Sequence, residues 1–323
     1  MIDSIDYIIK DVEYVDFKYL RNIGINDISS FHLNNIIGNL TTNYRWSYKT
    51  VEFKYYPSTN TVVAYTNTHK ILNKLDITLT DKTLYESLIH NIFINVFANE
   101  TIKYELDRLD YYVDIKLADD MILQKYLMLY QFQMPKYGHT KLKNIYPTSI
   151  YRSSRRGQYN INIYSKFQES SDERYRNVLR IELQMKRPKI KKEYEKNGIS
   201  KELSNYWNKE AMEEYYFNYY RNFFGTGKHM KYTVAAKIIN RSDLSSNWKK
   251  KLKRFLKARM FQINNTGIVK AKQTVDKYIA KLGELNINAL CMPEVYETFF
   301  PNVDGIDNLL DLAYTVAVKK YFL

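Results

Sequence analysis

The sequence predicts an α+β protein in which a part of mixed strands and helices precedes a mainly helical C-terminal part. Three observations lead to this prediction. β-Rich runs flank a turn near residue 57, apolar residues recur at helical spacing from residue 84, and helical periodicity dominates the chain after residue 238. The length of 323 residues fits one large domain or two ordinary ones.

The first half of the chain alternates between strand and helix patterns. "VEFKYYPSTNTVVAYT" has two β-rich runs around residues 57–60, which predicts a hairpin. Thr80 and Asp81 are candidate helix caps before an apolar stripe from Leu84 to Val96. "KYELDRLDYYVDIKL" then predicts a strand with alternate residues on one face, and a helix is expected over 119–131. "IDYIIKDVEYVD" near the N-terminus also alternates like a strand.

The second half begins with two further strand-like runs, "YRSSRRGQYNINIYSK" and "VLRIELQMK". From Ser200 to Phe224 the pattern is helical and rich in aromatic residues. The tail holds two amphipathic helical segments, "DLSSNWKKKLKRFLKARM" and "TGIVKAKQTVDKYIAKLGELNIN". We therefore expect two domains, with bounds 1–235 and 236–323.

Charge narrows the class of partner. The net charge is +14 and the pI is near 9.4, which favours a polyanion such as nucleic acid. The single cysteine and the scattered histidines exclude a disulfide framework and a cysteine-rich zinc site, and "GTGKH" lacks the spacing of a P-loop. No apolar run is long enough for a membrane span, and the acidic N-terminus does not resemble a secretory signal, so we expect a cytoplasmic protein with no membrane partner.

Acids in strands and tyrosines beside arginines are the remaining groups with chemistry. Cleavage of a phosphodiester needs cations or a metal on the phosphate oxygens and a positioned attacking group. A tyrosine can attack if a neighbour removes its proton, and the phosphotyrosine formed can be reversed by a strand end. Asp110, Asp114 and Glu182 supply the hard oxygen ligands that Mg²⁺ or Mn²⁺ prefers. Lys166 lies two residues after Tyr164, on the same face if the strand continues.

These motifs resemble those of the rolling-circle replication initiator (Rep) family. "DRLDYYVD" resembles the Arg-hydrophobe-Asp motif of plasmid initiators, and "YRSSRRGQYNINIYSK" resembles their Tyr-x-Gly-Ser-Arg segment followed by Ile-Tyr-x-Lys. The order of hairpin, helix, Arg-hydrophobe-Asp strand, Tyr-x-Lys strand and "LRIELQMK" strand is similar to that of the strand-nicking initiators of filamentous phages. The tail from "TGIVKAK" to "ALCMP" is similar to the C-terminal region of the phage family.

The resemblance implies a nucleophile, metal-binding acids and basic partners. It implies Tyr164 as the nucleophile with Lys166 beside it, Asp110 and Glu182 as acids around the metal, and Arg108 and Arg180 as DNA-binding residues. Three positions depart from the plasmid pattern, because Ser153, Gly157 and Asn162 replace a glycine, a serine and an arginine. Tyr151 therefore stays a rival nucleophile, and both tyrosines could instead be packing residues. Asp110 could equally form a salt bridge, and Glu182, between Arg180 and Lys186, could be structural.

Two clusters of basic residues are candidate contacts to DNA. Arg152, Arg155 and Arg156 precede a strand on a turn, where phosphate contact is the expected use. The other cluster is the segment from Lys249 to Arg259, which would grip duplex DNA or form an ordinary solvated helix face. The DNA-binding residues expected are Arg108, Arg152, Arg155, Arg156, Arg180, Lys186, Lys249, Lys250, Lys253, Arg254 and Lys257.

The resemblance implies a metal-dependent enzyme that nicks and rejoins single-stranded DNA at a plasmid or phage origin to start rolling-circle replication, and the net positive charge agrees with a polyanionic substrate. We expect an antiparallel sheet that carries the site on one face, with helices on the other face. The expected partners are origin DNA, single-stranded or hairpin at the nick with flanking duplex, together with a host helicase and a second copy of the chain. The alternatives are a non-catalytic DNA-binding regulator and an RNA-binding protein that stacks bases on tyrosines.

Overall fold

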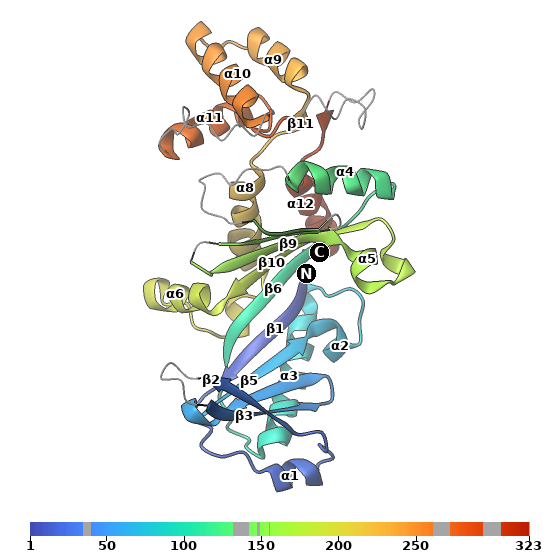
Figure 1. The fold of residues 1–323 in the computed structure, drawn as a ribbon, viewed down its shortest axis with the longest axis vertical. Helices are drawn as coiled ribbons and strands as arrows, with labels where there is room; N and C mark the ends of the chain where they lie inside the picture. Colours follow the sequence, from blue (N-terminus) through green and yellow to red (C-terminus); the bar gives the residue numbers. More distant parts are fainter. Residues whose placement is uncertain are drawn as a thin grey trace.

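The centre of the molecule is one antiparallel sheet (Figure 1). The structure is a computed structural model that describes residues 1–34, 40–131, 142–146, 149–154, 156–260, 272–292 and 305–322. Within them the sheet has ten strands in the order β2-β3-β4-β5-β1-β6-β10-β9-β8-β7, and each neighbouring pair is antiparallel. The strands are β1 (Ile2–Ile9), β2 (Ser29–Asn34), β3 (Leu40–Tyr48), β4 (Val51–Tyr56), β5 (Thr61–Asn67), β6 (Glu105–Lys116), β7 (Leu142–Tyr146), β8 (Ser149–Ser153), β9 (Tyr159–Ser165) and β10 (Val178–Lys186).

The predicted strands are confirmed. β4 and β5 form the hairpin around the turn at Pro57–Thr59, and β6, β9 and β10 fall on the three strand-like motifs. The N-terminal strand β1 lies in the middle of the sheet, between β5 and β6. The first residues of the chain therefore support the same strand that carries the Arg-hydrophobe-Asp motif.

Alternation along the strands gives the sheet one apolar face and one polar face. On β6 and β10, Leu109, Tyr111, Ile181 and Leu183 are buried in the main core. The alternate residues of the two strands, which include Asp110, Tyr112 and Glu182, lie on the opposite face. Helix α3 (Lys82–Phe97) and a π-helical turn pack against this apolar face, whereas helix α5 (Lys166–Ser170) reaches the polar face. The predicted α+β architecture with an antiparallel sheet is confirmed.

Packing of the helices on the apolar face is visible in ring contacts. The ring of Phe93, on helix α3 (Lys82–Phe97), contacts Phe53 of β4 and Tyr7 of β1. Tyr216, in a π-helical turn at Met212–Phe217, contacts Tyr111 of β6. The remaining helices of this part are α1 (Phe17–Asn22), α2 (Thr68–Leu72), α4 (Asp120–Gln131), α5 (Lys166–Ser170), α6 (Arg187–Asn197), α7 (Lys209–Ala211) and α8 (Asn218–Phe224).

The helix expected from Ser200 to Phe224 begins later than predicted. α7, the π-helical turn and α8 follow one another from Lys209 to Phe224. The side chain of Asn208 accepts a hydrogen bond from the backbone N–H of Ala211 at 2.7 Å, so it caps the helix at that point. Residues 203–205 form a separate 3₁₀ turn.

The C-terminal part contains a second, smaller core. Helices α9 (Tyr232–Arg241), α10 (Ser246–Met260) and α11 (Lys272–Glu284) pack around buried residues that include Ile239, Leu256 and Leu282 (Figure 1). Two short strands, β11 (His229–Met230) and β12 (Gly305–Ile306), pair with each other, and helix α12 (Leu309–Lys320) packs back against β6. The domain bounds 1–235 and 236–323 stay a prediction. None of the helices in the described ranges is long and apolar enough to cross a membrane.

Candidate active site

The site lies on the polar face of the sheet, where strands β6, β8, β9 and β10 run side by side. Cross-strand register places the side chains in rows. One row is Asp114, Arg180, Tyr164 and Ser149; the next is Tyr112, Glu182, Asn162 and Tyr151; a third is Ser4, Asp110, Gln184, Asn160 and Ser153. Residues from three separate motifs of the sequence and from the N-terminal strand β1 thus become neighbours.

A cavity of about 690 Å³ opens over these rows. Six of the residues predicted to act in the site line it together, namely Arg108, Asp110, Tyr151, Tyr164, Lys166 and Glu182. Its volume falls in the range of about 300–1,000 Å³ that is typical of small-ligand binding sites.

Tyr164 is held by a carboxylate. Its hydroxyl donates to Oε2 of Glu182 at 3.0 Å, from β9 to the neighbouring strand β10. Burial raises the pKa of Tyr164 well above its usual value, and the adjacent charge of Glu182 raises it further. The phenol is therefore protonated at rest, with an acceptor for its proton already in place.

Glu182 is positioned by amide donors. Its Oε1 accepts from Nδ2 of Asn162 at 2.9 Å and from Nε2 of Gln184 at 3.1 Å. Its own backbone carbonyl accepts from the hydroxyl of Tyr220 at 2.6 Å on the apolar face. Both carboxylate oxygens thus have defined partners, and Oε2 is the one aimed at Tyr164.

Asp110 forms a bidentate pair with Arg108. Nε of Arg108 donates to Oδ1 of Asp110 at 2.8 Å, and Nη2 donates to Oδ2. Burial raises the pKa of Asp110 well above its usual value; Arg108 opposes this shift, whereas Glu182 adds to it. Arg108 also lies 3.6 Å from Asp6 and keeps 31% of its side chain exposed at the cavity.

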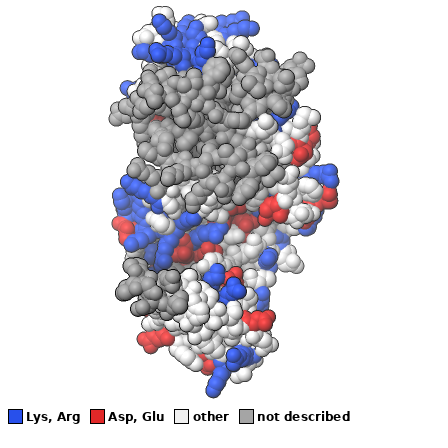
Figure 2. Space-filling view, in the orientation of Figure 1, with Lys and Arg blue, Asp and Glu red and all other residues white. Residues whose placement is uncertain are grey.

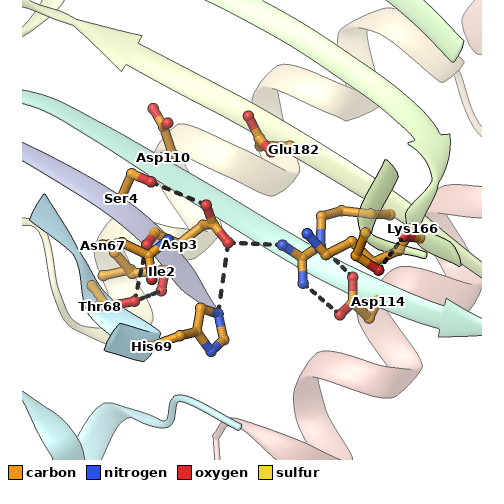
Figure 3. A network of polar contacts seen from close by, with 12 residues as sticks. Ile2, Asp3, Ser4, Asn67, Thr68, His69, Asp110, Asp114, Lys166 and Glu182 are labelled. Atoms are coloured by element: carbon orange, nitrogen blue, oxygen red, sulfur yellow. Dashed lines mark hydrogen bonds and ion pairs between the residues drawn. The ribbon is translucent and has the colours of Figure 1, made fainter. Parts of the chain in front are cut away.

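The acids of the site meet part of what a divalent cation requires. The side chains of Asp110 and Glu182 project to the same side of the sheet (Figure 3), and carboxylate oxygens suit Mg²⁺ or Mn²⁺. Among the described residues no group of three His, Cys, Asp or Glu side chains forms a metal-holding cluster. Of the three acids predicted to bind a metal, Asp110 and Glu182 line the cavity, so these two would hold an ion there.

Lys166 reaches the cavity from a helix. The expectation that it continues the strand after Tyr164 is wrong, because β9 ends at Ser165, whose side chain accepts from the backbone N–H of Gln168 and so caps α5. Lys166 is the first residue of α5, with Nζ 6.0 Å from the centre of the Tyr164 ring and 2.6 Å from Glu169. Its cation still lies beside the tyrosine.

Asp114 and Arg180 form a second network at the edge of the cavity. Arg180 donates to both oxygens of Asp114, at 2.7 and 2.8 Å, and to Asp3 at 2.7 Å. Asp3 in turn contacts Ser4 and His69 (Figure 3). Arg180 is 1% exposed and lies over the ring of Tyr112 at 4.0 Å. The structure therefore places Asp114 with Arg180, and the metal-binding role of the one and the DNA-binding role of the other stay predictions.

The rival tyrosine, Tyr151, lines the same cavity from strand β8. Tyr151 is opposite Asn162, and its hydroxyl lies 3.5 Å from Oγ of Ser153. Arg156 is exposed in the turn before β9, and Lys186 lies opposite Arg108 at the end of β10. Arg152 is in β8 with its side chain outside the described residues, and Arg155 lies outside them altogether.

The basic residues of α10 divide into two groups. Nζ of Lys249 donates to the backbone carbonyl of Asn240 at 2.9 Å, and Nζ of Lys253 donates to its side chain at 2.8 Å. Lys250, Arg254 and Lys257 are exposed, at spacings of four and three residues that place them on one side of the helix. Lys and Arg also gather over the end of the molecule formed by α9 and α10 (Figure 2).

Several residues of the cavity were not found from the sequence. Asp3, Ser4 and Asn67 line it together with Asn162 and Ser149. The alternation of β1 marks Ser4 as opposite in face to Ile5, but only the pairing of β1 with β6 places it beside Asp110. The position of these residues along their strands therefore does not predict that they line the cavity.

Comparison with known proteins gives little. No family model matches the chain, and no curated protein matches it. Among solved structures, a rolling circle replication initiator protein from Geobacillus stearothermophilus is similar with a TM-score of 0.32 and 13% sequence identity, over 58% of this chain and 73% of that chain. At this TM-score and identity the two structures are only weakly similar.

Proposed function

We propose that this protein is a replication initiator that cuts one DNA strand at an origin and holds the cut end on Tyr164. The observation that carries the proposal is the hydrogen bond of 3.0 Å from the Tyr164 hydroxyl to Glu182, in a cavity lined by Arg108, Asp110 and Lys166. The resemblance of the motifs around these residues to rolling-circle initiators supports the same activity. The net charge of +14 suits a DNA substrate.

The chemistry follows from the contacts of Tyr164. Its Oη attacks the phosphorus while its proton passes to Oε2 of Glu182, the acceptor already bonded to it. The bond from phosphorus to the 3′ oxygen breaks, the 5′ phosphate stays on Tyr164, and the 3′ oxygen takes a proton and can prime synthesis. Because the pKa of the phenol is raised, loss of the proton must accompany the attack.

Cations balance the charge that builds up on the phosphate. Lys166 and Arg108 line the cavity and can contact its non-bridging oxygens. Asp110 and Glu182 would hold Mg²⁺ or Mn²⁺, which would polarise the phosphate. In the absence of DNA, Arg108 neutralises Asp110.

The rest of the chain has a binding role in this proposal. The exposed face of α10 with Lys250, Arg254 and Lys257 would contact duplex DNA beside the nick. A host helicase and a second copy of the chain are further proposed partners, and the cytoplasm is the proposed location. The proposal leaves Tyr151 as the alternative nucleophile, because it lines the same cavity.

The test is covalent capture. The protein is incubated with end-labelled single-stranded or hairpin DNA from its own replicon and manganese, and any adduct is located by peptide mapping. We expect an adduct on Tyr164 that is lost in Tyr164→Phe and kept in Tyr151→Phe. An adduct on Tyr151 would keep the activity and move the nucleophile, whereas tight binding without any adduct would favour a non-catalytic regulator.

A further inference from the structure

The polar face of the sheet continues past the cavity and carries aromatic rings there. On β4 and β5 every second residue is buried, and Phe53 packs on α3. Lys54, Tyr56 and Tyr65 alternate with these buried residues and lie on the opposite face. We call these three residues and Phe31 of β2 the aromatic platform.

Contacts within the platform arrange the rings next to one another. The rings of Phe31 and Tyr56 meet edge to face with centroids 6.0 Å apart. Nζ of Lys54 is 4.4 Å from the centre of the Tyr65 ring. Phe31, Tyr56 and Tyr65 are only partly buried, so part of each side chain is exposed to solvent.

The platform borders the cavity in the register of the sheet. Tyr65 lies opposite Asp6, and Asp6 lies opposite Arg108, which lines the cavity. Asn67, also in the cavity lining, follows Tyr65 on the same face of β5. Residues two apart on a strand are about 6.7 Å apart, and stacked nucleotides rise about 3.4 Å each, so the platform begins roughly two nucleotides beyond the rim.

Charge on the platform is balanced, which points to base stacking as its main use. Glu52 lies 3.2 Å from Lys54, and Asp6 lies 3.6 Å from Arg108, so each acid on this surface has a cation beside it. Aromatic faces next to a cation bind the bases of a single strand without regard to sequence. A base-paired duplex hides its bases and cannot use such faces.

We propose that Phe31, Tyr56 and Tyr65 stack on bases of the single-stranded DNA that extends from the cavity. This inference rests on the proposed function, because it supplies the path of the same substrate. It adds a binding subsite on the N-terminal half of the sheet, outside the motifs that resemble the initiator family's nicking segments.

Binding of a labelled single strand of mixed sequence tests the platform. Affinity is measured by fluorescence anisotropy in a Tyr164→Phe background, so that cleavage plays no part. We expect Tyr65→Leu to weaken binding roughly tenfold, at every salt concentration alike, since one stacked base contributes enough for such a change. Tyr65→Phe keeps the ring and should bind as the parent does. Tyr14→Leu, at a tyrosine that is 73% exposed between β1 and α1, is the matched control.

The outcomes separate the platform from the nickase. If Tyr65→Leu and Tyr56→Leu, folded as judged by circular dichroism, bind the single strand as tightly as Tyr14→Leu does, the platform is refuted even if adducts form on Tyr164. If they lose affinity but no origin fragment is ever cut, the platform stands and the nickase fails. A chain that does not bind single-stranded DNA would overturn the platform, and ultraviolet cross-linking of iodouracil-substituted DNA to Tyr56 or Tyr65 would place the strand directly.

Discussion

Glu182 is the residue in which two proposed roles meet. One oxygen accepts from Tyr164, and the other accepts from Asn162 and Gln184. A base needs a free lone pair toward the nucleophile, and Oε2 has that geometry at 3.0 Å. On the apolar face of the sheet, the hydroxyl of Tyr220 donates to the backbone carbonyl of Glu182. This contact holds the backbone that carries the carboxylate in place.

Replacing Glu182 with glutamine tests the base directly. The amide keeps the size of the side chain but cannot take the proton, so we expect adduct formation to slow by about 10²–10⁴ while DNA still binds. The slow rate should rise with pH, as solution base replaces the carboxylate. Single-turnover cleavage measures both effects. An unchanged rate and pH profile would leave Glu182 a structural residue.

Asp6 gives a prediction about stability. Burial raises its pKa to about 6, and Arg108 only partly offsets this. In the unfolded chain the pKa is near 4, so the folded state binds the proton more tightly and is penalised once Asp6 ionises. Unfolding free energy should therefore fall between about pH 4 and pH 7, with this residue contributing up to about 3 kcal/mol.

Urea unfolding of wild type and Asp6→Asn across that pH range measures the contribution. The difference between the two proteins should favour Asp6→Asn increasingly as pH rises through about 6. A difference that does not vary with pH would show that Asp6 keeps an ordinary pKa.

At the scale of elements, the basic residues of α10 have two different environments that the sequence does not distinguish. Lys249 and Lys253 donate to Asn240 of α9, whereas Lys250, Arg254 and Lys257 face outward. We expect glutamine at each outward position to weaken duplex binding and to reduce the slope of log affinity against log salt by about 0.9 for each phosphate that is no longer neutralised. Lys249→Gln and Lys253→Gln should leave the slope unchanged. Equal slopes for both groups would make α10 an ordinary solvated helix.

Local patterns predicted most elements, and long-range pairing decided the rest. The hairpin of β4 and β5, the helix α3 and the strands β6, β9 and β10 follow from alternation, caps and turn residues. The start of the helical run at Lys209 and the end of β9 at Ser165 depended on single side-chain caps, Asn208 and Ser165. Sequence separation explains the residues that were missed, since Asp3 meets Arg180 across 177 positions.

At the scale of the whole molecule, the chain returns to its first core after building a second one. α9 to α11 enclose their own apolar cluster, and α12 then packs against β6 with Leu309 and Ala313 in the main core. The helical unit is thus inserted between helices α8 and α12, which both pack in the main core. Its position relative to the site depends on the contacts at the joint between the two cores.

His229 lies at that joint. It is fully buried on β11, and a carbonyl can only accept, so its Nδ1–H donates to Leu290 at 2.9 Å. Nε2 then accepts from the hydroxyl of Tyr130 on α4 at 2.7 Å. The same hydroxyl accepts from the backbone N–H of Leu309, at the start of α12, at 3.3 Å. One neutral imidazole thus connects β11, α4 and α12.

Acid should loosen this joint. Burial lowers the pKa of His229 to about 4, so protonation opposes folding. Its contribution to stability is full above the unfolded value near 6.5 and is lost as pH falls from there to about 4, by about 3 kcal/mol. Glutamine at position 229 cannot titrate. The free energy of unfolding of His229→Gln should therefore be lower than that of wild type at neutral pH, but it should decrease less as pH falls from about 6.5 to about 4. Because Asp6 titrates in both proteins, its opposite effect cancels in the difference. Parallel urea-unfolding curves for the two proteins at every pH would show that the joint does not sense protons.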